Sequence, residues 1–406
     1  MLFWGGYSGS YVFRTYYLLV LFSCFFNGYL FSLGRSLRYE IGLMTWLFAA
    51  IWLSMLFSPY PPLPRASYYF ENLAVDLLLC VLLTLVLKER AELEAFSNAL
   101  IFCMSLLAVW GIQQHFLGNV RLEGLGGSAW GDSNGVASVY VLFLPLALGK
   151  FLFAETPRAK FLGLTATILM VLLVIFTESR AGLVGMACAF LALAWYARSL
   201  KKVLLTACLA AIVALPFITN AYTQRMETMR SSNTLDASAR SRLILWQAGL
   251  MVFSDHPIFG TGFMTYPQAK MGYEDRFYNL DEDFRKWVFR RENKKVTHNT
   301  YIELLSDCGL MGGIPFILLV FLGIRYGFRA RRLLSAKNAD RQGTLLLSAV
   351  SAGITGFAVC IMTIDAALAV FLYVQITLAF LLKDQVTQVN EAAVGNAEPL
   401  ILMESA

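Results

Sequence analysis

His298 is the residue of this chain whose type and position best suit acid–base chemistry. The chain contains three histidines, and an imidazole with an unperturbed pKa of about 6.5 can accept a proton near neutral pH. His298 lies in the segment 296–305, where a long polar stretch gives way to an apolar one. A role in capping the helix that starts there explains the position equally well, so both interpretations stay open.

The other two histidines are weaker candidates for catalysis. His115 lies near the end of an apolar segment, which is typical of an interfacial histidine, and His256 lies in a turn before a proline. The three show no ligand spacing such as His-x-x-x-His, so we expect no metal site. A solvated charge run explains the acidic residues 281–283 more simply than a carboxylate metal site does. No phosphate-binding Gly-x-x-x-x-Gly-Lys-Ser/Thr loop is present, so ATP-driven chemistry and a nucleotide cofactor are not expected.

Two arginines are candidates for binding an anion. Arg180 interrupts sequence that is otherwise apolar from 161 to 197, and an arginine in or beside a membrane span is costly unless it is paired or faces water. Arg180 lies in a tight Ser-Arg-Ala-Gly turn, which favours a ligand-binding role over a side chain that only extends to the membrane interface. Arg242 is favoured over Arg240 because it directly opens an amphipathic helix, and a guanidinium can grip phosphate with two hydrogen bonds. A headgroup-facing or solvated cluster is the alternative for both.

The composition indicates the kind of fold that positions these side chains. Of 406 residues, 58% are hydrophobic and 15% are charged, against roughly 25% charged in soluble proteins, and the mean hydropathy is +0.60. The apolar runs are continuous rather than alternating, which excludes a β-barrel. We therefore predict an all-α polytopic membrane protein with about 11–12 transmembrane helices. The clear spans are 15–34, 41–57, 70–87, 94–117, 134–154, 160–177, 181–197, 202–219, 302–324, 343–363 and 365–382, and a twelfth could lie within 1–33.

Basic residues predict the orientation of these spans. Lysines and arginines cluster in alternate short loops, which indicates that those loops are cytoplasmic. The clusters are Arg35/Arg38, Lys88/Arg90, Lys150/Arg158/Lys160, Arg198/Lys201/Lys202 and Arg325/Arg329/Arg331/Arg332/Lys337/Arg341. The predicted organisation is an N-terminal set of helices over 1–219, a large outer loop over 220–300, C-terminal helices over 301–383 and a mobile cytoplasmic tail over 384–406.

The outer loop contains the only long polar stretch between spans. Leucines, a tryptophan and a phenylalanine at helical spacing predict an amphipathic helix over 241–253. The segment 256–263, with two glycines and a proline, predicts a turn. Residues 274–295 are densely charged with interspersed aromatics, which suits a surface helix.

The predicted topology brings three helix starts to the same outer face. The spans that begin near 134, 181 and 302 all enter from outside, and helix N-termini favour anions. Thr300 with Glu303 matches a capping box, which would place His298 just before the first turn. Because Glu303 is then occupied, no partner for the imidazole can be named. Asp76 and Asp365 lie in or beside spans, where they could relay protons in a transporter or pair with arginines.

The ordered set of motifs resembles the O-antigen ligase and polymerase superfamily. The resemblance rests on the segments 179–182, 242–246, 255–262 and 298–301, followed by Leu304 and Gly309-Leu310-x-Gly312. It implies a multi-pass protein of the bacterial inner membrane with a GT-C-type glycosyltransferase architecture and a periplasmic active site. It also implies a donor glycan on undecaprenyl pyrophosphate, with no metal or ATP. In the ligase branch the acceptor is the lipid A–core oligosaccharide, and transfer completes lipopolysaccharide.

The resemblance also implies roles for individual residues. His298 would be the base that deprotonates the acceptor, and Arg180 and Arg242 would bind the pyrophosphate, giving an inverting displacement. Further candidate substrate contacts are Arg121, Asn134, Arg240, Asn299 and Tyr301. Overall size and the late position of the large loop favour a ligase over a polymerase that uses the same donor. A transporter of lipid-linked glycan or of an anion is the alternative from another class, but it would more often show inverted repeats or paired broken helices.

Overall fold

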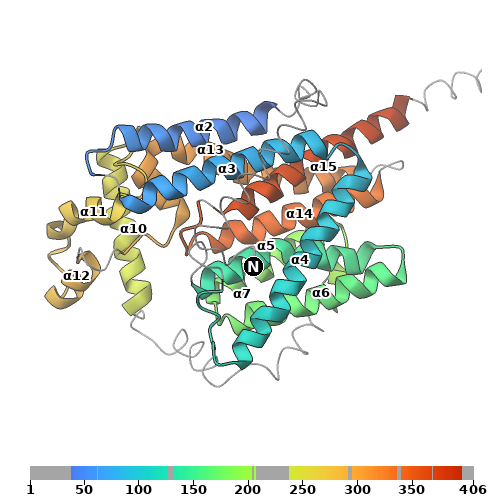
Figure 1. The fold of residues 1–406 in the computed structure, drawn as a ribbon, viewed down its shortest axis with the longest axis horizontal. Coiled ribbons are helices and arrows are strands. Elements are labelled where there is room, and N and C mark those ends of the chain that lie inside the picture. The colour runs from blue at the N-terminus through green and yellow to red at the C-terminus, as the bar shows by residue number, and fades with distance from the viewer. Residues whose placement is uncertain are drawn as a thin grey trace, which may run out of the picture.

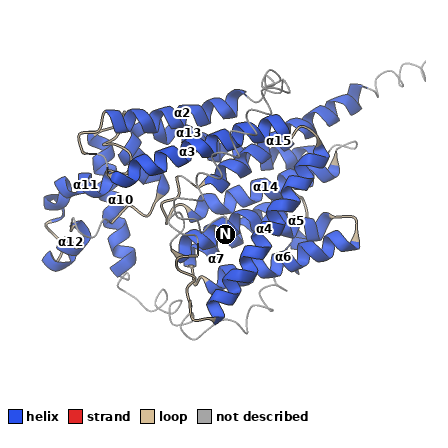
Figure 2. Ribbon diagram, in the orientation of Figure 1, coloured by secondary structure: helices blue, strands red, loops and turns tan. Residues whose placement is uncertain are grey.

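Every regular element in the described part of the chain is a helix (Figure 2). The computed structural model describes residues 38–61, 63–125, 132–203, 205–206, 237–290, 295–335, 340–367 and 369–395. Within these ranges, 8 helices are long and apolar enough to cross a membrane. They are α2 (Arg38–Leu56), α3 (Pro64–Val86), α4 (Arg90–Phe116), α5 (Ser133–Phe153), α6 (Pro157–Phe176), α13 (Thr300–Leu333), α14 (Arg341–Cys360) and α15 (Val370–Gly395). The prediction of an all-α polytopic membrane protein is confirmed, whereas the GT-C architecture stays a prediction.

The predicted spans match these helices closely. Each predicted span from 41 to 197 and from 302 onward coincides with one helix, the shortest being α7 (Arg180–Tyr196). The predicted span 15–34 and any second span within 1–33 lie outside the described residues, as does most of 202–219. The tail predicted to be mobile from Asp384 instead starts as helix, because α15 continues to Gly395 with Val386 buried against its neighbours.

Small residues let α5, α7 and α14 pack closely at the centre of the bundle (Figure 1). A Cβ atom at Gly185 would lie 2.2 Å from Cys360 Sγ, and one at Gly353 would lie 2.0 Å from the Leu142 carbonyl oxygen. Small residues at helix interfaces in membranes permit this kind of close backbone approach. The contact at Gly185 brings the first turns of α7 against the last turn of α14.

Predicted basic loops lie together at one end of the bundle, away from the starts of α5, α7 and α13. Arg90 at the start of α4 pairs with Asp340 before α14, and Gln385 of α15 donates to the Lys88 carbonyl at 2.7 Å. Arg329 of α13 donates to Thr387 of α15 at 3.1 Å. Loops that the sequence predicts to be on one side of the membrane therefore contact one another in the structure.

The outer loop folds into a small helical unit, seen beside the bundle in Figure 1. It contains α10 (Ala237–Asp255), α11 (Tyr266–Ala269), the 3-10 helix η4 (Lys270–Phe277) and α12 (Glu282–Phe289). The amphipathic helix predicted over 241–253 is confirmed within α10. Its apolar face packs in a small core formed by Ile244, Leu245, Ala248, Tyr266, Phe277, Val288 and Phe289.

The single surface helix predicted over 274–295 is wrong. η4 ends at Phe277 and α12 starts only after Asp281, whose carboxylate accepts the backbone N–H of Phe284 at 3.0 Å. Such a side-chain cap starts a new helix, so the charged run is divided in two. The prediction failed because the charge pattern is similar on both sides of the break.

A kink at Gly309 divides α13, and the predicted turn at 256–263 docks onto it. Gly309 has φ 60° and ψ −158°, a conformation almost restricted to glycine. The backbone N–H groups that follow bond to the turn. Leu310 donates to the Pro257 carbonyl at 2.8 Å, and Met311 donates to the Ile258 carbonyl at 3.1 Å. The turn thus satisfies the backbone groups that the kink frees.

The same junction depends on a second glycine and on a buried carboxylate. A Cβ atom at Gly260 would lie 2.3 Å from the Asp307 carbonyl carbon, so neither this position nor Gly309 has room for a side chain. The Asp307 side chain is buried and accepts the backbone N–H groups of Met264 and Tyr266, both at 2.8 Å. The outer unit is therefore fixed to the first half of α13, the helix that follows His298.

Candidate active site

His298 lies immediately before the helix cap of α13 and is not the cap itself. Asn299 is the capping residue, because its Oδ1 accepts the backbone N–H groups of Tyr301 at 3.1 Å and Ile302 at 3.2 Å. The predicted capping box of Thr300 and Glu303 is therefore wrong, and so is the alternative in which His298 serves only as a cap. Thr300 is instead the first residue of the helix, and its hydroxyl donates to the Ile364 carbonyl at 2.7 Å. His298 has φ 50° and its side chain is 38% exposed, which leaves the imidazole available to a ligand.

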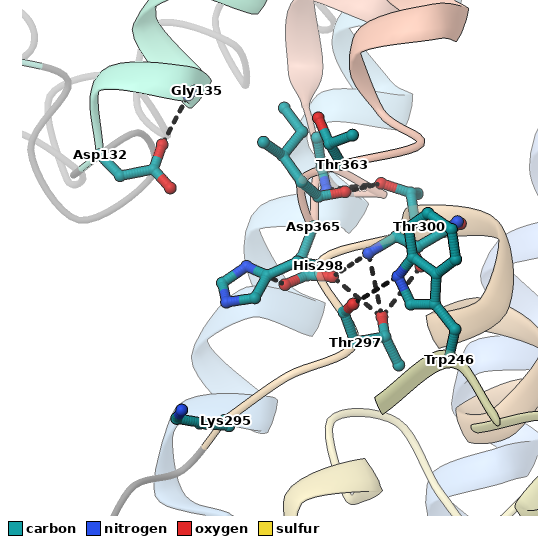
Figure 3. A network of polar contacts seen from close by, with 12 residues as sticks. Asp132, Gly135, Trp246, Lys295, Thr297, His298, Thr300, Thr363 and Asp365 are labelled. Atoms are coloured by element: carbon teal, nitrogen blue, oxygen red, sulfur yellow. Dashed lines mark hydrogen bonds and ion pairs between the residues drawn. The ribbon is translucent and has the colours of Figure 1, made fainter. Parts of the chain in front are cut away.

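Asp365 is the partner of the imidazole. Its Oδ2 lies 3.6 Å from His298 Nδ1, which is an ion-pair distance for a protonated imidazole and longer than a hydrogen bond. The other carboxylate oxygen, Oδ1, accepts from Thr297 Oγ1 and from the backbone N–H of Asn299, both at 3.2 Å. Figure 3 shows the carboxylate between the imidazole and Thr297. Asp365 is thus fixed on one side and faces the histidine on the other.

The loop that carries Asp365 is held against the first turn of α13. Thr300 donates its backbone N–H to the Ile361 carbonyl at 2.9 Å and its hydroxyl to the Ile364 carbonyl at 2.7 Å. The backbone N–H of Ala366 then donates to Thr300 Oγ1 at 2.9 Å. Asp365 therefore sits between two anchored residues. The sequence leaves Asp365 as a proton-relay group of a transporter or as a partner of an arginine, and the structure pairs it with His298.

Helix α10 places Arg242 at the same site. Trp246 Nε1 donates to the Thr297 carbonyl at 2.9 Å, which joins α10 to the residue before His298. Arg242 lies four residues earlier and therefore on the same face of α10. It is partly buried, and its charge is among the groups that act on the His298 imidazole. The structure thus brings two of the sequence-predicted residues together.

The electrostatic environment keeps His298 suited to act as a base. Burial lowers the pKa of His298 most strongly, and the positive charges of Arg242 and Lys295 lower it further. The negative charges of Asp365 and Asp132 raise it, but the net pKa remains below the ordinary value for histidine. At neutral pH the imidazole is therefore mostly unprotonated and can accept a proton.

The starts of α5 and α7 meet each other and the end of α14. Ser179 caps α7 and donates its hydroxyl to Asn134 Oδ1 at the start of α5, at 2.7 Å. Arg180 is the first residue of α7. Cys360 Sγ at the end of α14 approaches the Ala181 carbonyl at 3.5 Å, and the next residue, Ile361, bonds Thr300 as described. The three helix N-termini therefore lie at the same end of the bundle, as predicted, while the side of the membrane stays a prediction.

The other candidate substrate contacts make contacts within the protein. Arg121 pairs with Glu123 at 2.9 Å and donates to Ser133 at the start of α5 at 3.1 Å. The guanidinium of Arg240 lies 4.9 Å from the centre of the Phe284 ring of α12. The Tyr301 hydroxyl donates to the Ala358 carbonyl of α14 at 3.0 Å. Together with the capping by Asn299, these contacts support the site structurally, and substrate binding by these residues stays a prediction.

A comparison with protein families supports the reading of the motifs. Residues 165–317 match the family model described as O-antigen ligase. This match supports membership of the O-antigen ligase and polymerase superfamily. The matched region contains Arg180, Arg242 and His298, whereas Asp365 lies beyond it. The match supports a ligase- or polymerase-class activity, which is a transfer of glycosyl groups. A comparison with curated proteins found no match.

Among the residues that the structure describes, no group of three or more His, Cys, Asp or Glu side chains is arranged to bind a metal ion. Metal independence stays a prediction, as does the absence of a cofactor.

Proposed function

We propose that this protein is the ligase of the superfamily. It moves O-antigen polysaccharide from undecaprenyl pyrophosphate to the lipid A–core oligosaccharide at the periplasmic face of the inner membrane. The observation that carries the proposal is the His298–Asp365 pair, which lies beside Arg242 where three helix N-termini converge. A base next to a concentration of positive charge suits the transfer of a sugar from a phosphate leaving group to a hydroxyl.

In the proposed reaction, His298 removes the proton from a core-sugar hydroxyl. The resulting oxygen attacks the anomeric carbon of the first O-antigen sugar, and the bond from that carbon to the pyrophosphate oxygen breaks. The glycosidic bond forms with inversion, undecaprenyl pyrophosphate leaves with the electron pair, and His298 is left protonated. Asp365, 3.6 Å from Nδ1, stabilises the imidazolium as it forms.

Positive charge stabilises the leaving group in this proposal. Arg242 and Arg180 would bind the pyrophosphate oxygens, assisted by the positive ends of α5, α7 and α13. The donor already contains a good leaving group, so the reaction requires neither ATP nor a metal ion. The placement of the basic loops at the other end of the bundle supports a periplasmic location for the site.

A deletion strain complemented with variants tests this function. Cells without the gene should lose long O-antigen on lipopolysaccharide and accumulate polymer on the lipid carrier, and the wild-type gene should restore capping. His298→Ala should fail to restore it at a normal protein level, whereas His115→Gln, a change at a histidine outside the site, should restore it. A deletion strain that retains single-repeat capping would identify a polymerase instead. Full capping by His298→Ala would refute the assignment of the base.

A further inference from the structure

Two lysines lie in or next to the loop that connects the outer unit to His298. Lys270 is 0% exposed, although lysine is almost never fully buried. Its Nζ donates to the Val288 carbonyl at the end of α12, at 3.0 Å, and to the Lys295 carbonyl at 2.9 Å. Lys270 thus anchors the backbone three residues before His298.

Lys295 directs its ammonium toward an aromatic ring rather than a carboxylate. Its Nζ lies 2.6 Å from the centre of the Trp287 ring, and a cation over an indole face is attracted to it. Figure 3 shows Lys295 and His298 on the same short loop that leads into α13. The Lys295 charge also acts on His298. The ammonium is therefore close enough to influence the reacting group.

These two ammonium groups lack an acidic partner among the described residues, since no carboxylate oxygen there lies within 4.0 Å of either one. Burial lowers the pKa of each lysine to about 8, and for Lys270 the charge of Lys295 lowers it further. Two neighbouring positive charges, one buried and one partly buried, without an acidic partner in the described part of the chain favour the binding of an anion.

We propose that Lys295 contacts a phosphate group of the substrate beside His298, with Lys270 as the residue that positions it. This inference rests on the proposed function and adds a third cation to Arg242 and Arg180. Lysine binds phosphate as a point charge. Trp287 holds the ammonium in place until the phosphate arrives, so little ordering is required on binding.

Phosphate could come from either substrate. The donor contains a pyrophosphate, and an acceptor core oligosaccharide can contain phosphate esters. The two sources are distinguished by removing the charge of Lys295 and measuring which substrate then binds more weakly. Loss of affinity for undecaprenyl pyrophosphate indicates the donor, and a raised KM for the acceptor alone indicates the acceptor.

The first test measures binding without turnover. The full chain is purified in lipid nanodiscs, and inorganic pyrophosphate and undecaprenyl pyrophosphate are titrated against its thermal unfolding. Lys295→Met should weaken binding of the pyrophosphate probes by about tenfold if the donor is the source, which is the low end for loss of one charged hydrogen bond. Lys295→Arg should retain binding. Lys286→Met is the matched control, because Lys286 is an exposed lysine of the same unit that pairs with Glu282.

The second test compares wild type with Lys295→Arg as pH rises, so it does not depend on a neutral variant that folds. Lys295 loses its charge as pH passes its pKa of about 8, whereas arginine remains charged. In the described part of the chain, Lys295 interacts with Trp287 of α12, Lys270 of η4 and His298. These groups are the same in wild type and in Lys295→Arg. Between pH 7 and 9, wild type should lose more pyrophosphate affinity than Lys295→Arg.

The third test measures steady-state transfer, and it separates this inference from the proposed function. If wild type transfers no glycan, the proposed function fails. If wild type is active, Lys295→Met should raise KM for the donor or for the acceptor with a smaller effect on kcat. Unchanged KM values for both substrates, together with unchanged pyrophosphate binding and no pH difference from Lys295→Arg, would overturn the role of Lys295.

Discussion

His298 and Asp365 are 67 positions apart in the chain, yet His298 Nδ1 and Asp365 Oδ2 lie 3.6 Å apart. The pairing depends on Thr300, which bonds the loop on both sides of Asp365. One carboxylate oxygen is held by Thr297 and the Asn299 backbone, and the other faces the imidazole. The aspartate can therefore orient the ring and stabilise its protonated form without leaving its own position.

Removing the charge of Asp365 should change both the rate and its pH dependence. Asp365 raises the pKa of His298, so in Asp365→Asn that pKa falls further. Activity that needs neutral His298 is lost as pH falls through its pKa, and the acid limb of the profile should therefore move to lower pH. The rate at neutral pH should fall by about 10²-fold, the low end for acid–base catalysis.

Thr363→Ala is the control for this variant. Thr363 lies in the same loop, and its hydroxyl donates only locally to the Cys360 carbonyl at 3.0 Å. Its kcat and acid limb should match those of wild type. An acid limb that is identical in wild type and Asp365→Asn would show that Asp365 does not influence the base.

The two arginines of α10 should differ in their effect on the donor. Arg242 acts on His298, whereas Arg240 lies over the Phe284 ring. Arg242→Met should raise KM for the lipid-linked donor by about tenfold, as expected for the loss of a charged hydrogen bond. Arg240→Met should raise it less. Donor titrations with the purified proteins measure this difference, and an equal or reversed order would contradict the placement of Arg242.

The kink in α13 should not tolerate a side chain. Gly309→Ala would place a Cβ atom 2.3 Å from the Ile258 carbonyl oxygen at a φ of +60°, and backbone strain of this kind costs about 1–3 kcal/mol before the clash is counted. The variant should unfold at a lower temperature and give less protein in membranes. Gly272→Ala is the control, because no atom lies within 4 Å of its added Cβ. Equal melting temperatures for the two variants would refute the docking of the 256–263 turn.

Asp307 should connect the outer unit to α13 through hydrogen bonds. Asp307→Asn can accept at one oxygen only, so either Met264 or Tyr266 would lose a hydrogen-bond acceptor for its backbone N–H. Leaving one such buried group unsatisfied costs about 1–3 kcal/mol. Limited proteolysis should cut the outer unit faster in this variant than in wild type. Cleavage at the wild-type rate would contradict the connection.

The sequence predicted the bundle well because hydropathy reports directly on burial in lipid. The spans between 41 and 197 and those after 302 followed from continuous apolar runs. The alternation of basic loops predicted that the N-termini of α5, α7 and α13 lie at the same end of the bundle. The failures were local. The break at Asp281 and the cap at Asn299 depend on which of several polar side chains reaches a backbone N–H, and spacing alone does not decide this.

The partner of His298 could not be predicted for a different reason. Asp365 becomes its neighbour only through contacts between the α14–α15 loop and Thr300, and no local pattern encodes them. The available signal was an acidic residue in a three-residue gap between two spans, on the same predicted face as His298. That signal narrows the choice of partner without determining it.

Transfer by the purified protein tests the central claim most directly. Wild type and His298→Ala are given undecaprenyl-pyrophosphate-linked glycan and lipid A–core in the presence of EDTA and without nucleotide, under single-turnover conditions. Wild type should form the glycan–core product, and His298→Ala should form it about 10²- to 10⁴-fold more slowly, with donor affinity nearly unchanged. Transfer by His298→Ala at the wild-type rate, or wild-type activity that appears only when Mg²⁺ is added, would contradict the account.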